Sequence, residues 1–225
     1  MRCCERKGPS YYFREDLPLA LSHGTILDVE TTGLEPSRSG IVCFGSISGS
    51  TLEIRCRARD SGADDFYRQL NAVLMVSPQP FYAYNAKFDA SMLQKRVGYR
   101  GPRFIDLFEP WRSRAEAHNI KFPSLDELVR GPWDALPPQL VPVREEIPAN
   151  AYLREDELQW LRKGRRFRRE AWEFRGLVSG KDVPKLWRDY LNGEDEALVQ
   201  IAEHNRQDLL KTLCLLTFLG RPLTA

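Results

Sequence analysis

The order of strand-like and helix-like segments in the first half of this chain constrains its fold most strongly. A short apolar run, TILDV, ends at the turn-forming ETTGLEP, and two further strand-like runs, GIVCFGSIS and TLEIRCRA, flank a glycine-containing turn. An amphipathic pattern over residues 63–76, a strand-like PFYAY, a helical NAKFDASMLQKRVG and a strand-like RFIDLF follow. Antiparallel-looking strands followed by alternating helices and strands predict an α/β protein with a mixed sheet of about five strands flanked by helices.

The segments around this predicted sheet are less regular. Residues 1–23 are interpreted as an N-terminal extension of one domain that spans residues 24–225. Prolines and a basic, aromatic stretch make residues 110–180 an irregular, loop-rich or helical insertion. DVPKLWRDYLNG and the long EDEALVQIAEHNRQDLLKTLCLLTFLG then predict two C-terminal helices, the first with Pro184 near its start.

Composition argues against several classes of protein. Five cysteines without a CxxC spacing predict neither a disulfide framework nor a structural zinc site, which favours a reducing cytoplasm. No run approaches the roughly 18 apolar residues of a membrane span, and the first residues lack the apolar core of a signal peptide. A net charge of +2 implies no uniform attraction to nucleic acid. We therefore expect a soluble cytoplasmic protein that does not enter membranes.

An aspartate interrupts the apolar pattern of the last predicted helix. Five residues at helical spacing form its apolar stripe: Leu198, Ala202, Leu209, Leu213 and Leu216. Asp208 lies at the flank of this stripe, and His204 lies one turn earlier. A carboxylate at the edge of a core is costly unless something neutralises it, so Asp208 requires a salt bridge, a cap or a metal ion.

Three further acids could complete an oxygen-rich metal site. Asp28 and Glu30 are two residues apart in the first predicted strand, so both side chains point to the same face of the sheet. Asp89 lies one turn into a helix that follows a strand, near the edge where ligands gather in α/β sheets. Carboxylates suit Mg²⁺, which prefers oxygen ligands. The alternatives are a solvated strand pair, a helix N-terminal acid and, for Asp208, a core salt bridge.

Three motifs, DVETTG, YNAKFD and HNRQD, resemble in this order those of the DEDD, or DnaQ-like, exonuclease superfamily. FIDLF and DVPKLWRDYLNGEDEALVQIAEHNRQDLL are more narrowly similar to its YprB-like group of RNase H-like exonucleases. The similarity covers residues 24–218 and is weakest over 110–180. It implies an RNase H-like fold and metal ligands at four positions: Asp28, Glu30, Asp89 and Asp208. It also implies phosphodiester hydrolysis with 3′-to-5′ polarity by two Mg²⁺ or Mn²⁺ ions.

The position of His204 departs from both types of this superfamily. The superfamily has either a histidine five residues before the last aspartate or a tyrosine four residues before it. Here Glu203 holds the first position and His204 the second, so the spacing resembles the tyrosine type and the side chain the histidine type. As a catalytic residue His204 would deprotonate or orient the attacking water, because histidine accepts a proton near neutral pH. The alternative is a histidine at the flank of the helix.

Other residues are candidates for substrate contact. By the resemblance, three residues of the turn after the first acids contact the terminal nucleotide: Thr31, Thr32 and Gly33. Asn85 is either a substrate contact or the N-cap of the following helix. Asp106 in FIDLF could be a fifth acid, but an aspartate that caps the next turn is the favoured interpretation.

The stretch RKGRRFRR, residues 162–169, is the strongest basic cluster in the chain. In a helix, four arginines would share one face suited to a phosphate backbone: Arg162, Arg165, Arg166 and Arg169. Nearby aromatic residues could stack on unpaired bases. The alternative is a solvated charged face balanced by neighbouring acids.

Together these features predict a metal-dependent 3′-to-5′ exonuclease that acts on a single-stranded end of DNA or RNA. An RNase H-like endonuclease acting on hybrid or structured substrates is one alternative. A nucleic-acid-binding module without catalysis is the other. The residues do not distinguish DNA from RNA, because 2′-hydroxyl recognition depends on the local shape of the site.

Overall fold

The computed structural model describes residues 4–17, 20–101, 103–119, 121–122, 124–125, 178–218 and 223–224. Its main sheet has seven strands in the order β1-β2-β6-β5-β4-β7-β8. Their bounds are β1 Cys4–Lys7, β2 Ser10–Asp16, β4 Thr25–Thr31, β5 Ile41–Ser48, β6 Thr51–Arg57, β7 Phe81–Ala83 and β8 Phe104–Asp106. A small second sheet pairs β3 (Ala20–Leu21) with β9 (Leu223–Thr224). The expected mixed α/β sheet is confirmed: β4 to β6 are antiparallel, and β4, β7 and β8 are parallel.

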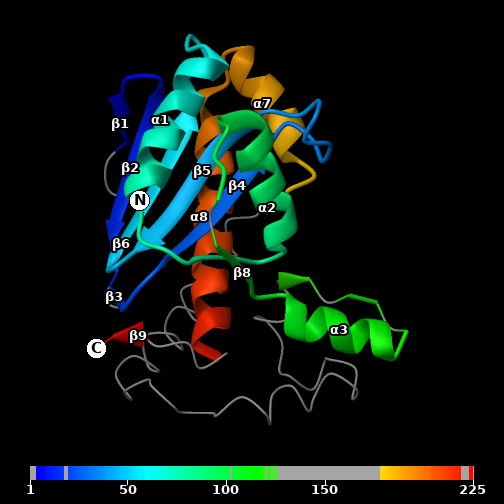
Figure 1. Cartoon of the computed structure of the whole chain (residues 1–225). Helices are drawn as coiled ribbons and strands as arrows, with labels where there is room; N and C mark the ends of the chain where they lie inside the picture. Colours follow the sequence, from blue (N-terminus) through cyan, green and yellow to red (C-terminus); the bar gives the residue numbers. More distant parts are fainter. Residues whose placement is uncertain are drawn as a thin grey trace.

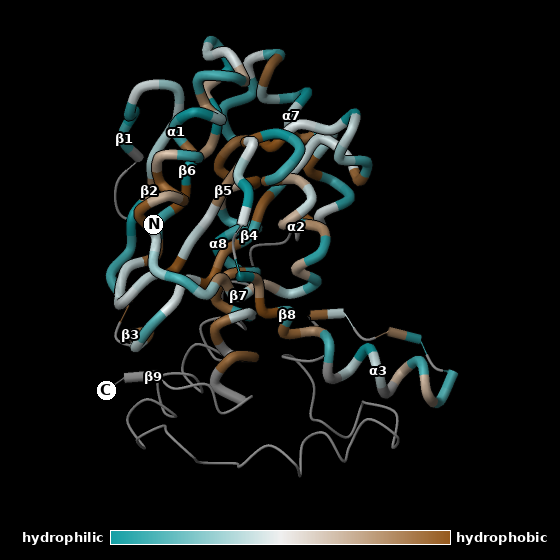
Figure 2. The backbone as a smooth tube through the Cα atoms, viewed as in Figure 1, coloured by the Kyte–Doolittle hydropathy of each residue, from teal (hydrophilic) through white to brown (hydrophobic). Residues whose placement is uncertain are grey.

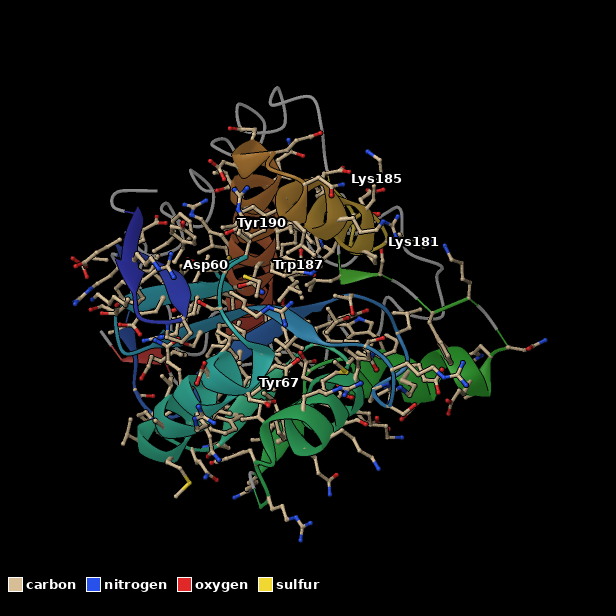
Figure 3. The ribbon with its side chains drawn as sticks, turned by 90° about the horizontal axis from the view of Figure 1, so that it is seen from above. Asp60, Tyr67, Lys181, Lys185, Trp187 and Tyr190 are labelled. Carbon is tan, nitrogen blue, oxygen red and sulfur yellow. The ribbon has the colours of Figure 1, made fainter. Side chains whose placement is uncertain are left out.

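Helices cover both faces of the main sheet (Figure 1). One face carries α1 (Ala63–Val76) and α2 (Ala86–Met92), which continues as the π-helix η1 (Leu93–Val97). The other face carries α7 (Val183–Leu191) and α8 (Asp195–Phe218), and α8 contacts β4, β5 and β6. The view from above separates Tyr67 of α1 from Trp187 and Tyr190 of α7 by the sheet (Figure 3). Among the described residues, one further helix, α3 (Glu109–Ala117), follows β8.

The central strand β4 divides its side chains between two cores. Ile26 packs in the core shared with α7 and α8, whereas Leu27 and Val29 pack in the core shared with α1 and η1. Apolar residues follow the central strands in Figure 2. Because side chains alternate along a strand, Asp28 and Glu30 lie on the α8 face together with Ile26. The expectation that these two acids share one face is confirmed.

The start of α2 differs from its predicted form. Asn85 precedes the first residue of α2, but its side chain makes no capping hydrogen bond. Its backbone is in the left-handed region, with φ 59° and ψ 49°, whereas a capping side chain requires extended backbone. Asn85 therefore holds the N-cap position of α2, as predicted, but its side chain does not cap the helix. At the other end, Gly98 has a φ of 72° and ends η1 where the sequence places the end of the helix.

Two strands of the sheet come from the segment interpreted as an N-terminal extension. β2 pairs with β6 along its whole length, and β1 pairs with β2. Tyr12 and Phe13 are buried, so this segment contributes to the core. Most of the predicted insertion at 110–180 lies outside the described residues. None of the helices in the described parts of the chain has the length and apolar character needed to cross a bilayer.

Candidate active site

A glycine allows α8 to approach the sheet beside Asp28. Gly45 of β5 pairs with Asp28 of β4. A Cβ on Gly45 would collide with Oδ1 of Asn205 and would lie 2.6 Å from Cδ1 of Leu209, both on α8. Without that side chain, Asn205 is fully buried and its Nδ2 donates to Oδ2 of Asp28 over 2.7 Å and to the Asp28 carbonyl over 3.3 Å. Asn205 thus fixes the carboxylate of Asp28.

Asn205 was absent from the residues predicted for the site. Its signal in the sequence is its place in the helix, four residues after Ile201 and four before Leu209, where an apolar side chain is expected. A buried amide at such a position needs a polar partner. Asp28 supplies that partner.

Three predicted residues from β4 and α8 form a compact cluster. Nε2 of His204 lies 3.6 Å from Oε1 of Glu30 and 3.8 Å from Oδ2 of Asp208. One ligand atom from each of the three lies within 4.8 Å of the others. The side chains of Glu30 and His204 are 8% and 11% exposed, and that of Asp208 is 24% exposed. A ligand bound here would thus be enclosed by β4 and α8 and reached past Asp208.

The fourth predicted acid, Asp89, reaches β4 from the first turn of α2. It is buried, and its Oδ1 accepts a hydrogen bond from the backbone N–H of Val29 over 3.2 Å. Val29 lies between Asp28 and Glu30 in the chain, so the three carboxylates gather around the same part of β4. The structure therefore brings together the acids that are separate in the sequence.

Burial and mutual repulsion disfavour ionisation of these acids. Burial raises the pKa of Asp28 to about 7, and the negative charge of Asp208 adds to this effect, while Lys211 and Asn205 oppose it. Burial also raises the pKa of Glu30 well above its ordinary value, together with the charge of Asp28. Burial and the charge of Asp28 likewise raise the pKa of Asp89. A cation bound among the carboxylate oxygens would therefore stabilise the ionised form of these acids.

Asp208 has an ion-pair partner on its own helix. Nζ of Lys211 lies 2.6 Å from Oδ1 of Asp208. This contact is the core salt bridge weighed as the alternative role of Asp208. The other oxygen, Oδ2, faces His204. Ion pairing and metal binding therefore use different atoms of this carboxylate and do not exclude each other.

Glu203 and His204 hold the two positions that distinguish the DEDD types, five and four residues before Asp208, and their contacts differ. Glu203 forms an ion pair with Arg206 over 3.3 Å, and Arg206 binds Glu15 of β2 over 2.6 Å. His204 contacts Glu30 and Asp208 instead. The contacts of α8 thus place its histidine, rather than its glutamate, among the acids.

The donor set fits a hard divalent cation. Asp28, Glu30, Asp89 and Asp208 offer carboxylate oxygens, the donors preferred by Mg²⁺ and Mn²⁺. The raised pKa values of three of them show that the protein alone compensates their charge incompletely. In addition, Oδ1 of Asn205 is buried beside Asp28 and has no hydrogen-bond partner among the residues that the structure describes.

The polar side chains of the turn after β4 form hydrogen bonds with the backbone of the same loop. The hydroxyl of Thr31 donates to the carbonyl of Gly33 over 2.7 Å, and the hydroxyl of Thr32 accepts from the N–H of Gly40 over 2.9 Å. A Cβ on Gly33 would lie 2.7 Å from Oγ of Ser39. The structure thus gives the hydroxyls of Thr31 and Thr32 a role in closing the turn.

The remaining predicted residues lie outside the cluster. Asp106 accepts a hydrogen bond from the N–H of Phe108 over 3.0 Å, which confirms that it caps the turn. It also pairs with Arg112, whose guanidinium donates to Oδ1 of Asn85 over 3.2 Å. The four arginines predicted to contact phosphates lie outside the described residues: Arg162, Arg165, Arg166 and Arg169.

A family model described as the RNase_H superfamily matches residues 25–135 and 168–219. No curated protein matches the chain. One similar solved structure is an apo form of a nuclease, 16% identical, with 89% of this chain and 73% of that chain covered and a TM-score of 0.45.

Two further solved structures are similar to this chain, also at low sequence identity. A family B DNA polymerase from Pyrobaculum calidifontis is 16% identical, with 89% and 24% of the two chains covered and a TM-score of 0.45. The chain thus spans about a quarter of that polymerase. Brucella melitensis NrnC bound to pGG is 13% identical, with 92% and 86% covered and a TM-score of 0.34.

Proposed function

This chain belongs to the RNase H superfamily, and on that premise we propose that it is a divalent-metal-dependent 3′-to-5′ exonuclease of the DEDD type. Its substrate is the single-stranded end of DNA or RNA. The observation that carries the proposal is the convergence of Glu30, His204 and Asp208, with ligand atoms within 4.8 Å of one another. Asp28 and Asp89 adjoin this cluster, and burial together with the negative charge of a neighbouring acid raises the pKa of each.

The four acids would hold two Mg²⁺ or Mn²⁺ ions. When bound, these cations supply positive charge that stabilises the charge developing on the phosphate, and they lower the pKa of water. Asn205 keeps the carboxylate of Asp28 in place through the 2.7 Å hydrogen bond to its Oδ2. Lys211 holds Oδ1 of Asp208 in the same way.

His204 accepts the proton of the attacking water at Nε2. This atom lies 3.6 Å from Glu30 and 3.8 Å from Asp208, so both carboxylates stabilise the imidazolium that forms. The resemblance of FIDLF and of the last two helices supports a place in the YprB-like group, and the histidine at the tyrosine spacing fits neither DEDD type fully. The free, buried thiols of Cys43 and Cys56 support a reducing cytoplasm as the location.

The direct test uses end-labelled single-stranded, double-stranded and hybrid oligonucleotides with Mg²⁺, Mn²⁺ or chelator. We expect stepwise shortening from the 3′ end of single strands that requires a divalent cation. Asp89→Asn is the matched inactive control, because it removes a ligand but keeps the shape of the side chain. Retention of activity in this variant would contradict the proposed site.

The same panel distinguishes the alternatives. An endonuclease acting on hybrids would cut a circular strand, on which an exonuclease finds no end. A binding module without catalysis would leave every substrate intact. The ion pair between Lys211 and Asp208 is the observation that favours this second alternative.

A further inference from the structure

A cleft of about 460 Å³ lies beside the start of α2, away from the acid cluster. Tyr84 and Asn85 line it from the end of β7, and Phe108 and Arg112 line it from the segment after β8. Because β4, β7 and β8 are parallel, their carboxyl ends lie at one edge of the sheet. The cleft therefore opens at the same edge as the acids at the end of β4.

The cleft is linked to Asp89 through the start of α2. Asp106 accepts a hydrogen bond from the N–H of Asn85 over 3.0 Å. Asn85 lies one helical turn before Asp89. A strand whose terminal phosphodiester lies at the acids can therefore continue into the cleft.

Three aromatic rings, those of Tyr84, Phe108 and Phe122, line the cleft. The ring centroids of Tyr84 and Phe108 are 4.9 Å apart, and those of Phe108 and Phe122 are 5.7 Å apart with the rings at 83°. Phe122 is 46% exposed, which is unusual for a phenylalanine. An exposed aromatic face beside a polar cleft is a surface on which a nucleobase stacks.

Two basic side chains, Lys87 and Arg112, and one carboxylate, Glu116, line the cleft. The guanidinium of Arg112 lies 4.9 Å from the centroid of Phe108 and is fixed by ion pairs with Asp106 and Glu109. Lys87 is exposed at the rim and forms no ion pair with any residue that the structure describes. Its ammonium is thus available to a phosphate.

We propose that this cleft binds an unpaired nucleobase of the substrate strand, stacked on Phe122, while Lys87 contacts the adjoining phosphate. This inference rests on the proposed function and names the feature that selects single strands. A base in a duplex is stacked on both faces and paired along its edge, so it cannot enter a cleft with aromatic walls. An unpaired base enters at no such cost.

The test measures binding of a short single strand that carries 2-aminopurine, in chelator, so that no cleavage occurs. Loss of base stacking in Phe122→Ala should weaken binding roughly 10- to 100-fold and remove quenching of the 2-aminopurine fluorescence. Phe122→Tyr keeps an aromatic ring and should therefore keep both the binding affinity and the quenching of 2-aminopurine fluorescence. Lys87→Gln should reduce the salt dependence of binding by about 0.7 in the logarithmic slope, the value for one phosphate of a single strand.

Met75→Ala is the control, because Met75 is also an exposed apolar side chain, 70% accessible, but lies near the end of α1. It should bind as the wild-type protein does. Equal binding by Phe122→Ala and wild type, or an equal loss on a blunt duplex of the same sequence, would overturn the inference. Since binding is measured without catalysis, a protein that binds through Phe122 but cleaves nothing would contradict the proposed function alone.

Discussion

The buried acids make the free energy of unfolding of the metal-free protein depend on pH. Burial raises the pKa of Asp28 to about 7, whereas an aspartate in an unfolded chain has a pKa of about 4. Between these values the folded state binds more protons than the unfolded state, so the free energy of unfolding falls as pH rises through this window. Glu30 and Asp89, with raised pKa values, act in the same direction.

We therefore expect the melting temperature in chelator to fall from about pH 5 to about pH 8, and Mg²⁺ or Mn²⁺ to restore it at the higher pH. Thermal unfolding followed by circular dichroism measures both effects. Asp28→Asn should be no less stable than wild type at the higher pH and less dependent on pH. A wild-type melting temperature that is unaffected by pH and cation would show that these carboxylates are already compensated.

The role of His204 is tested by the turnover of its variants. His204→Ala should lower turnover by roughly 10² to 10⁴, because general-base catalysis contributes about that much. The pH–rate profile should lose the limb that reports the histidine. His204→Tyr should keep part of the activity, since the spacing matches enzymes with a tyrosine there. Wild-type turnover of the alanine variant would make His204 a structural residue and Glu203 the next to test.

The metal-ligand candidates were predictable from local patterns, but the partner of Asp28 was not. The two-residue spacing of Asp28 and Glu30 in a strand fixes their common face, as the structure confirms. The ion pair of Lys211 with Asp208 follows from their i,i+3 spacing in one helix, whereas the hydrogen bond of Asn205 to Asp28 depends on how α8 packs on the sheet. No local pattern encodes that packing.

Among the elements, the contact between α8 and β5 depends on Gly45. Gly45→Ala should lower the free energy of unfolding by about 1–3 kcal/mol, because its Cβ meets Asn205 and Leu209 and displaces α8. Urea unfolding measures this change. Gly62→Ala is the matched control, since a Cβ there makes an ordinary 3.5 Å contact with Asp65. Equal stability of the two variants would mean that α8 shifts without cost.

Elements with a strong hydrophobic periodicity were predictable from the sequence, whereas strands that form mainly by pairing with a neighbouring strand were not. The amphipathic pattern over residues 63–76 gave the bounds of α1, and the runs around Gly49 gave the hairpin of β5 and β6. β1 and β2 escaped prediction because SYYFRED shows little alternation and becomes a strand by pairing with β6. The π-helix at Leu93–Val97 likewise has no signal of its own.

At the scale of the whole molecule, the basic stretch at 162–169 is predicted to bind substrate. Neutralising Arg165, Arg166 and Arg169 together should weaken binding and reduce its salt dependence, with a smaller effect on turnover at saturating substrate. Binding measured over a range of salt concentrations tests this. Unchanged binding at low salt would identify the stretch as a solvated surface.

The hydrogen bond between Asp28 and Asn205 joins positions 177 residues apart. A ribosome releases the strand that carries Asp28 long before it has made the helix that carries Asn205 and Asp208. Until that helix emerges from the exit tunnel and docks, the growing polypeptide holds Asp28 without its helical partners. The cluster around Asp28 is therefore completed only when the last helix of the chain has been made and has packed on the sheet.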